Sequence, residues 1–156
     1  MGADEASDKA ERLARLDQGF AGGIPHNKAL GLKFVNFEGA TAWLKLPYDE
    51  KLVGNPHTGV MHGGAITSML DAACGAAVFL ALKRMGPIAT LDLRIDYLKS
   101  GLAHKDVMCR TECYKLTRHI AFARGIAYHD DESDPIACAT GTFAIGTKGA
   151  PIPGTK

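Results

Sequence analysis

The chain has 156 residues, of which 46% are hydrophobic and 22% charged, and its formal net charge at pH 7 is +1. This length fits one domain with a single core, and the near-neutral charge excludes the broad basic field that attracts nucleic acid. Any anionic ligand must therefore be bound by local groups. The longest uncharged apolar stretch, residues 72–82, is about half as long as a membrane-spanning helix, so no membrane span is expected.

The N-terminus and the cysteines favour a cytoplasmic protein. Acidic residues occur early (Asp4, Glu5 and Asp8), and no apolar segment of a secretory signal follows them. The four cysteines are dispersed without a CxxC pair, which is typical of reduced thiols. The histidines lack the spacing of metal ligands. We therefore expect a cytoplasmic location without a metal or another cofactor.

The first elements in chain order are a short helix and a break. Residues 4–18 contain good helix formers, with Leu13 and Leu16 on one face and charges on the other. Gly22, Gly23 and Pro25 should end this helix. The expected organisation is an N-terminal helix and linker over residues 1–24, a main domain over 25–146 and a flexible tail over 147–156.

A long helix is expected in the middle of the chain. Residues 32–37 and 41–46 resemble a strand pair, and residues 47–59 form a loop rich in Pro, Gly, Asn and His. Residues 63–83 then read as one helix whose apolar residues surround its whole circumference. A helix of that kind is normally buried.

Four strands should follow this helix, at residues 88–98, 106–116, 119–129 and 135–145. In the first of them, Leu91, Leu93, Ile95 and Tyr97 alternate with charged residues. Short hairpin loops between the later strands favour an antiparallel sheet. The predicted fold is α+β: one long central helix wrapped by a curved antiparallel sheet of about six strands, plus an N-terminal helix.

The start of the long helix carries the most specific motif. Asn55 begins the segment NPHTGVMHGG, which ends in His62-Gly63-Gly64, and Asp71 lies nine residues beyond His62. This resembles the PaaI-like (phenylacetate-pathway) thioesterases of the hotdog-fold superfamily. Segments 89–97, 118–122 and 136–143 resemble strands or turns of the same family, so the resemblance covers about residues 25–146.

The resemblance implies an acyl-CoA thioesterase, with CoA as part of the substrate and no separate cofactor. In that family the site is shared between subunits, which implies that Asp71 of one chain faces Gly64 and Asn55 of its partner. The expected assembly is therefore a homo-oligomer, either a dimer or a dimer of dimers (a homotetramer).

Asp71 and the two glycines are the candidates for the reaction itself. A carboxylate in an apolar helix is costly, so Asp71 needs a role, as a base for water or as a direct nucleophile. Its structural alternative is a bond to loop backbone. At the helix start, where N–H groups lack internal partners, Gly63 would shape the site and the Gly64 N–H would polarise the thioester carbonyl. The alternative for both glycines is a hinge between loop and helix.

Three further residues are assigned to orientation. Asn55 would hold the carbonyl or the water, although an Asn is equally common in a Pro-containing turn. Thr90 matches a position where some relatives place a water-binding Ser, although on propensity alone it is a strand residue. His62 fits a structural role at the helix start better than that of a base.

Substrate binding is assigned more loosely. CoA phosphates need cations, and Arg118 is favoured over Lys115 and Lys99, each of which could equally be a solvated surface charge. His119 lies in the same turn as Arg118. Met69 is expected to line the acyl pocket, for which aromatic and medium-chain groups are both open.

Two other functions compete with hydrolysis. A hotdog dehydratase acting on acyl-CoA or acyl-carrier protein needs a His working with an acid across the dimer, and usually has a Pro-Gly type loop where this chain has His62-Gly63-Gly64. A non-catalytic acyl-CoA-binding protein would bind tightly without turnover, and it gives no role to Asp71.

Overall fold

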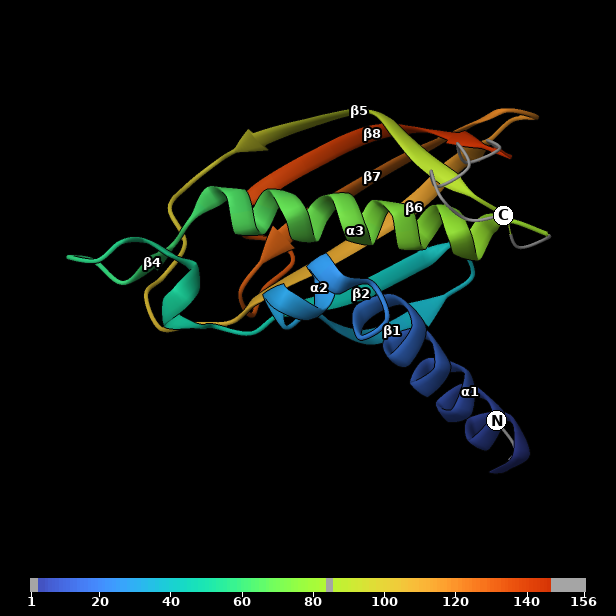
Figure 1. The fold of residues 1–156 in the computed structure, drawn as a ribbon, viewed down its shortest axis with the longest axis horizontal. Helices are drawn as coiled ribbons and strands as arrows, with labels where there is room; N and C mark the ends of the chain where they lie inside the picture. The colour runs from blue at the N-terminus through green and yellow to red at the C-terminus, as the bar shows by residue number, and fades with distance from the viewer. Residues whose placement is uncertain (1–2, 84–85, 147–156) are drawn as a thin grey trace, which may run out of the picture.

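The computed structural model describes residues 3–83 and 86–146, so the predicted tail over 147–156 lies outside the described residues. The chain begins with helix α1 (Ala3–Leu16), which projects away from the body of the molecule (Figure 1). A single π-helical turn (Asp17–Ala21) and the short helix α2 (Pro25–Leu30) follow it. Leu13 and Leu16 pack against the core, which agrees with the apolar face predicted for this helix.

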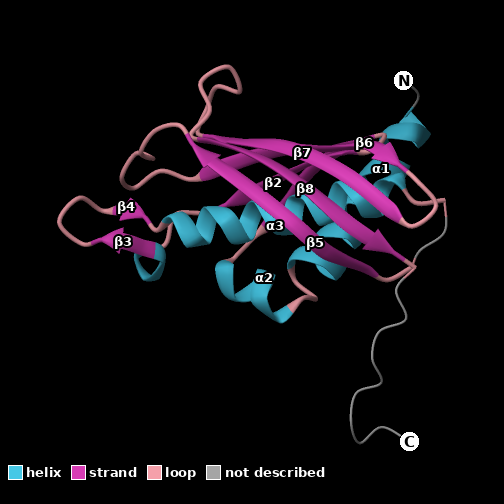
Figure 2. Cartoon of the chain, turned by 90° about the horizontal axis from the view of Figure 1, so that it is seen from above, coloured by secondary structure: helices cyan, strands magenta, loops and turns pink. Residues whose placement is uncertain are grey.

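One antiparallel sheet of six strands forms the body of the protein. Its spatial order is β1 (Lys33–Glu38), β2 (Thr41–Leu46), β6 (Val107–Leu116), β7 (Ile120–Tyr128), β8 (Ala137–Ile145) and β5 (Ile88–Tyr97). The long helix α3 (Gly63–Ala81) lies along the concave face of this sheet (Figures 1 and 2). The predicted α+β architecture, a long helix wrapped by a six-stranded sheet, is confirmed.

Two segments that were predicted as linker or loop contain structure. Within the predicted helix and linker over residues 1–24, the structure has the π-helical turn after α1, and α2 begins just beyond it at the start of the predicted main domain. The segment before α3 holds a 3-10 turn (Glu50–Leu52) and a two-stranded sheet of β3 (Val53–Asn55) and β4 (Val60–Met61). These elements are too short to give a hydrophobic period, so the sequence shows only their Gly, Pro and Asn residues.

Small side chains allow α3 to lie close to the sheet. The inward-facing positions of β7 are Ala121, Ala123, Gly125 and Ala127, and α3 presents alanines that are likewise fully or almost fully buried. The hydroxyl of the buried Thr111 on β6 donates to the Ala73 carbonyl of α3 at 2.7 Å. Packing at this density makes the position of α3 sensitive to a single added methyl group.

Helix α3 is covered by the sheet on one side only. By length and composition it could cross a membrane, but in this structure it packs on β2, β5, β6, β7 and β8. The opposite side holds Thr67, Ser68, Asp71 and Ala72, which are only half-buried. The expectation that the whole circumference is enclosed is therefore wrong for a single protomer, because the sheet contacts only one side of the helix.

A β-bulge in β5 changes which side chains face the helix. The pairing of β5 with β8 shifts register between Thr90 and Asp92, so Leu91 is an extra residue and is 58% exposed. The alternation that puts Leu91 on one face with Leu93 and Ile95 is therefore wrong at Leu91. The bulge turns Thr90 to the same face as Leu93 and Ile95, towards α3.

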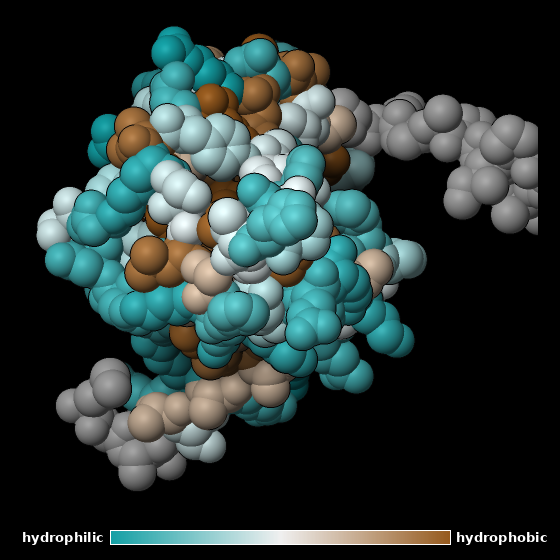
Figure 3. All heavy atoms as spheres, turned by 90° about the vertical axis from the view of Figure 1, so that its left-hand side faces the viewer, coloured by the Kyte–Doolittle hydropathy of each residue, from teal (hydrophilic) through white to brown (hydrophobic). Residues whose placement is uncertain are grey.

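Strand β5 is at the edge of the sheet, and one of its sides has no strand partner in the described part of the chain. Tyr97, at its end, is 47% exposed, and Leu98 and Leu102 in the next loop are 56% and 57% exposed. This loop lies at the end of the molecule shown in Figure 3, where apolar groups are interspersed among hydrophilic ones. A long edge strand with exposed apolar residues is suited to pairing with another chain.

Candidate active site

The start of α3 is fixed by His62. Its ring Nδ1 accepts the Gly64 N–H at 2.8 Å, so His62 is the N-cap of the helix. The hydroxyl of Tyr97 donates to the Gly63 carbonyl and also lies 2.8 Å from the Thr67 hydroxyl. The Gly64 N–H is thus already bonded, whereas the Gly63 N–H has no partner among the described residues.

Asp71 is paired with Thr90. The Thr90 hydroxyl donates to Asp71 Oδ1 at 2.9 Å, across the gap between α3 and β5. Asp71 is half-buried, and its other carboxylate oxygen has no partner in the described part of the chain. A carboxylate held by one donor, with a free oxygen facing a cavity, can accept a proton from a water or attack an electrophile.

The cavity at Asp71, called the Asp71 cavity below, has a volume of about 350 Å³. This volume falls within the range of small-molecule sites. Its apolar lining comes from α3, β5, β8 and the segment between α1 and β1: Phe20, Ile24, Ala72, Gly75, Ile88 and Phe143. Its polar lining, besides Asp71, is His26, Asn27, Ser68 and Thr90.

Sequence reasoning missed the contribution of residues 20–27 to this cavity. The glycines at 22 and 23 suggested a linker, but the π-helical turn brings Phe20 inward and α2 follows directly. Two apolar residues, Phe20 and Ile24, in a segment otherwise made of small and polar residues were the available signal. π-helical turns are often associated with functional sites.

The helix start and Asp71 lie apart within one protomer. Asp71 is nine residues beyond His62 on the same helix, a rise of about 13 Å. His62 and Gly64 line a second cavity of about 390 Å³, which shares only Ser68 with the Asp71 cavity. Asn55 is exposed, and its Oδ1 accepts the His57 N–H at 3.0 Å, an arrangement typical of an Asn in a turn.

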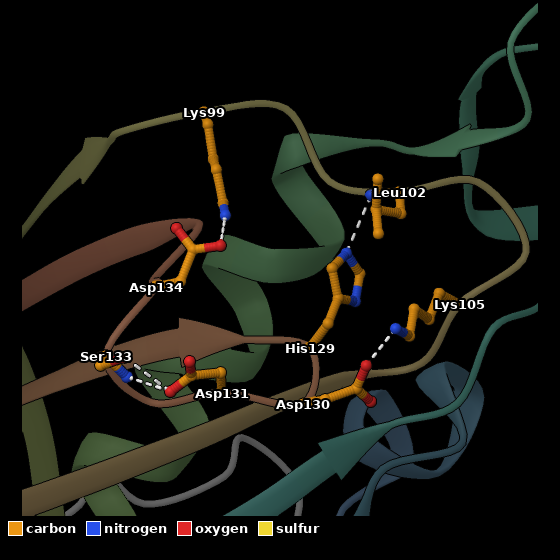
Figure 4. A network of polar contacts seen from close by, with 8 residues as sticks. All are labelled: Lys99, Leu102, Lys105, His129, Asp130, Asp131, Ser133 and Asp134. Carbon is orange, nitrogen blue, oxygen red and sulfur yellow. Dashed lines mark hydrogen bonds and ion pairs between the residues drawn. The ribbon is translucent and has the colours of Figure 1, made fainter.

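The basic candidates differ in how they are paired. Figure 4 shows Lys99 in an ion pair with Asp134, within a network that also joins Lys105 to Asp130. Lys99 is therefore already neutralised by a carboxylate. Arg118 and Lys115, by contrast, are exposed in and beside the β6–β7 hairpin, and their side chains have no partner in the part of the chain that the structure describes.

The two remaining binding candidates lie in different surroundings. His119 is exposed beside Arg118, and its backbone carbonyl accepts the Ile145 N–H at 2.9 Å. Met69 is completely buried in the core between α3 and the sheet. It does not line the Asp71 cavity, because it packs into the core beneath α3, whereas Asp71 lies at the edge strand β5 beside Thr90.

The cysteines do not supply a nucleophile to this site. Burial raises the pKa of the Cys74 thiol far above its usual range, and it raises that of Cys109 to about 12. Both thiols therefore stay protonated near neutral pH. All four cysteines are free, and two of them, Cys113 and Cys138, are only half-buried. Within residues 3–83 and 86–146, no cluster of three His, Cys, Asp or Glu side chains could hold a metal ion.

Comparison with known proteins agrees with this architecture. The thioesterase superfamily pattern matches residues 58–136. The medium/long-chain acyl-CoA thioesterase YigI of Salmonella typhimurium is 29% identical over 149 residues, covering 87% of this chain and 95% of that protein. A crystal structure of a protein from Pseudomonas aeruginosa is 41% identical, with a TM-score of 0.76, covering 85% of this chain and 97% of that one.

The E. coli PaaI protein from the phenylacetic acid degradation operon has a TM-score of 0.72 over 89% of this chain and 94% of its own. At 18% identity this likeness is one of fold. The superfamily pattern covers the helix start, Asp71 and Thr90, and the P. aeruginosa relative is matched over nearly its whole length. The chain therefore belongs to the thioesterase superfamily: it is a thioester hydrolase with the hotdog fold, which it shares with the PaaI protein.

Proposed function

We propose that this protein is an acyl-CoA thioesterase in which Asp71 carries out the hydrolysis of the thioester to a free acid and CoA. The observation that carries the proposal is the Asp71–Thr90 pair at a cavity with an apolar side. The cavity can take an acyl group while the carboxylate lies beside the reacting carbon. The name of the Salmonella relative, a medium/long-chain acyl-CoA thioesterase, supports the same substrate class.

Two routes are open to Asp71. As a base, it accepts a proton from a water whose oxygen attacks the thioester carbon. As a nucleophile, its free oxygen attacks that carbon and forms a mixed anhydride, which water then hydrolyses. In both routes the C–S bond breaks, CoA leaves as the thiol and the acyl group leaves as the acid. No metal or redox cofactor takes part in either route.

The carbonyl oxygen needs a donor as negative charge develops on it. The Gly64 N–H is the donor expected from the sequence, but here it is bonded to His62. It becomes available only if the His62 ring turns away. The Gly63 N–H, at the same helix start and free of partners among the described residues, needs no such movement. At the first turn of α3, the Gly63 N–H can therefore donate to the carbonyl oxygen without any change. The Gly64 N–H can do so only after the His62 ring has rotated.

The donor and the carboxylate should come from two subunits. Because about 13 Å of helix separates His62 from Asp71, one protomer does not bring them to the same carbon. Antiparallel pairing through the free edge of β5 would place two α3 helices side by side in opposite directions. Asp71 of one chain then approaches the helix start and Asn55 of its partner. A dimer, alone or within a tetramer, is the catalytic unit in this proposal.

The test is release of free thiol from a panel of acyl-CoAs: phenylacetyl, benzoyl and straight chains from acetyl to palmitoyl. Turnover of at least one of them is the expected result. Enoyl-CoA hydration without thiol release would indicate a dehydratase. Tight binding of acyl-CoA without any turnover would indicate a binding protein. Either of these outcomes overturns the hydrolase.

Thr90 should affect the rate more than binding. Changing Thr90→Val removes the hydroxyl that donates to Asp71 Oδ1 while keeping a similar shape. A hydrogen bond to a charged group contributes about 1.5–3 kcal/mol, so kcat should fall about 10-fold or more. Thr90→Ser keeps the hydroxyl and should retain most of the activity. An equal loss in both variants would show that Thr90 acts through packing.

Arg118 should contribute to recognition of the CoA phosphates. Arg118→Ala should raise KM for acyl-CoA several-fold with little change in kcat, because Arg118 is an unpaired cation on the surface. The KM for the same acyl group on N-acetylcysteamine, which lacks phosphates, should not change. Lys99→Ala is the matched control, since Lys99 is already paired with Asp134. A similar effect on both thioesters would exclude phosphate binding by Arg118.

A further inference from the structure

The polarity of the Asp71 cavity changes along α3. Ser68, Asp71 and Gly75 follow one another at intervals of three and four residues, so they share one face of the helix. Thr90 bonds Asp71, whereas the side chains nearest to Gly75 are the apolar Ile88 and Phe143. A ligand whose reacting group lies at Asp71 therefore has its apolar part directed towards Gly75.

The side of the cavity opposite α3 comes from the N-terminal segment, defined here as residues 17–30. Phe20 and Ile24 of this segment line the cavity. The buried Asn27 donates from Nδ2 to the Phe20 carbonyl at 3.0 Å, and Asp17 accepts the Phe34 N–H at 2.7 Å. The Phe20 and Phe34 rings meet edge to face at 6.3 Å. These contacts with Phe34 hold the N-terminal segment against β1. The segment is therefore a fixed wall of the cavity.

Gly75 leaves space in this cavity that the packing of the helix does not require. A Cβ at this position would lie 3.6 Å from Ile88 Cδ1 and 3.8 Å from Phe143 Cε1, both ordinary contacts. Glycine in a helix interior is unfavourable compared with alanine. Because neither backbone conformation nor a close neighbour demands glycine here, the open volume itself is the feature that Gly75 provides.

We propose that Gly75, together with Ile24 of the N-terminal segment, sets how long an acyl chain the enzyme accepts. This inference rests on the proposed hydrolysis of thioesters at Asp71. Asp71 and Gly75 are separated by about 6 Å along the helix axis. At about 1.2 Å per bond, as in an extended backbone, an acyl chain reaches Gly75 near its sixth carbon. The substrate class is therefore a straight acyl chain of medium or greater length, passing between α3 and the N-terminal segment.

The test compares decanoyl-CoA with butanoyl-CoA in each variant. Gly75→Leu fills the far part of the cavity, so the ratio of kcat/KM for decanoyl over butanoyl should fall at least 10-fold; each misplaced methylene group costs roughly 10-fold or more. Gly75→Ala should give a smaller change in the same direction. Hydrolysis of butanoyl-CoA should fall much less than that of decanoyl-CoA, because its chain ends before Gly75.

A second variant narrows the cavity from the opposite side and avoids the helix. Ile24 is 39% exposed, so Ile24→Trp should fold normally and lower the same ratio. Val35→Trp is the matched control: Val35 is 38% exposed on β1 and does not line the cavity. An unchanged ratio in folded Gly75→Leu and Ile24→Trp, with the native enzyme active, would overturn the inference and leave the thioesterase intact.

Failure of the proposed function would look different, because the native protein would release no thiol from either substrate. Binding of S-decyl-CoA, a thioether that cannot be hydrolysed, then tests the cavity by calorimetry. Binding at least 10-fold weaker in Gly75→Leu and Ile24→Trp than in the native protein, with Val35→Trp unchanged, supports the acyl cavity. Equal binding by all four proteins rejects it.

Discussion

Asp71→Asn is expected to reduce kcat for acyl-CoA hydrolysis by about 10²–10⁴-fold, the usual contribution of a general base. The amide keeps the shape of the side chain and an oxygen that can accept the Thr90 hydroxyl, now 2.9 Å from Asp71 Oδ1. It loses the negative charge that either deprotonates water or attacks the thioester. The measurement is steady-state thiol release, with thermal unfolding as the check on the fold.

Asp92→Asn is the matched control for this variant. Asp92 lies just beyond the bulge of β5, is exposed and does not line the Asp71 cavity. It removes the same charge from the same part of the molecule, so a general electrostatic effect would appear in both variants. Activity close to native in Asp71→Asn, or an equal loss in both, would remove Asp71 from the mechanism.

The longest elements of the fold could be predicted from the sequence. The long helix and the four strands after it each have enough residues for their hydrophobic pattern to show. The resemblance around His62, Gly63 and Gly64 then identified the family, which the superfamily match and the relatives confirm. Asp71 stood out because a carboxylate is unusual in an apolar helix.

The arrangement around Asp71 could not be predicted, because it depends on a β-bulge and a π-helical turn that leave no hydrophobic pattern in the sequence. Simple alternation would place Thr90 on the face opposite Leu93, and only the bulge at Leu91 turns it towards Asp71. Likewise, Phe20 lines the cavity because a π-helical turn continues past α1. Bulges and π-helical turns are single-residue changes in hydrogen bonding, so the hydrophobic periods on either side do not reveal them.

The sequence also does not show which basic side chains form ion pairs. Lys99, Lys115 and Arg118 are alike as residues near strand ends, but only Lys99 has an acidic partner, Asp134, supplied by the hairpin between β7 and β8. Met69 illustrates the same point for apolar residues. Its direction on α3, towards the sheet instead of the cavity, follows from how the helix is rotated against the strands.

Gly125→Ala is expected to destabilise the protein by about 2–3 kcal/mol, in the upper part of the usual range for overpacking, and to lower Tm by roughly 5–10 °C. The added Cβ would lie 2.4 Å from Thr111 Cγ2 and 2.8 Å from the Arg110 carbonyl oxygen. One of these contacts is to backbone, so β6 and β7 must separate. Thermal or urea unfolding measures the loss.

Two companion variants identify the cause of that loss. Gly19→Ala adds the same methyl group where nothing lies within 4 Å, so it should leave stability unchanged or raise it slightly. Thr111→Ser removes the Cγ2 atom but keeps the hydroxyl that donates to the Ala73 carbonyl. In the double variant with Gly125→Ala, the cost should be smaller than the sum of the single costs, because the closest contact is gone.

Additive costs in this cycle would show that the contact with Thr111 is not what destabilises the Ala variant. A loss of stability in the double variant that is smaller than the sum of the single losses would also bear on the active site. Thr111 holds α3 at Ala73, two residues beyond Asp71, and Gly125 lets β7 lie flat beneath Thr111. A sheet that opens at this point moves the helix that carries Asp71 away from Thr90 on β5. In that case Gly125→Ala should also lower kcat in the folded protein, which thiol release measures.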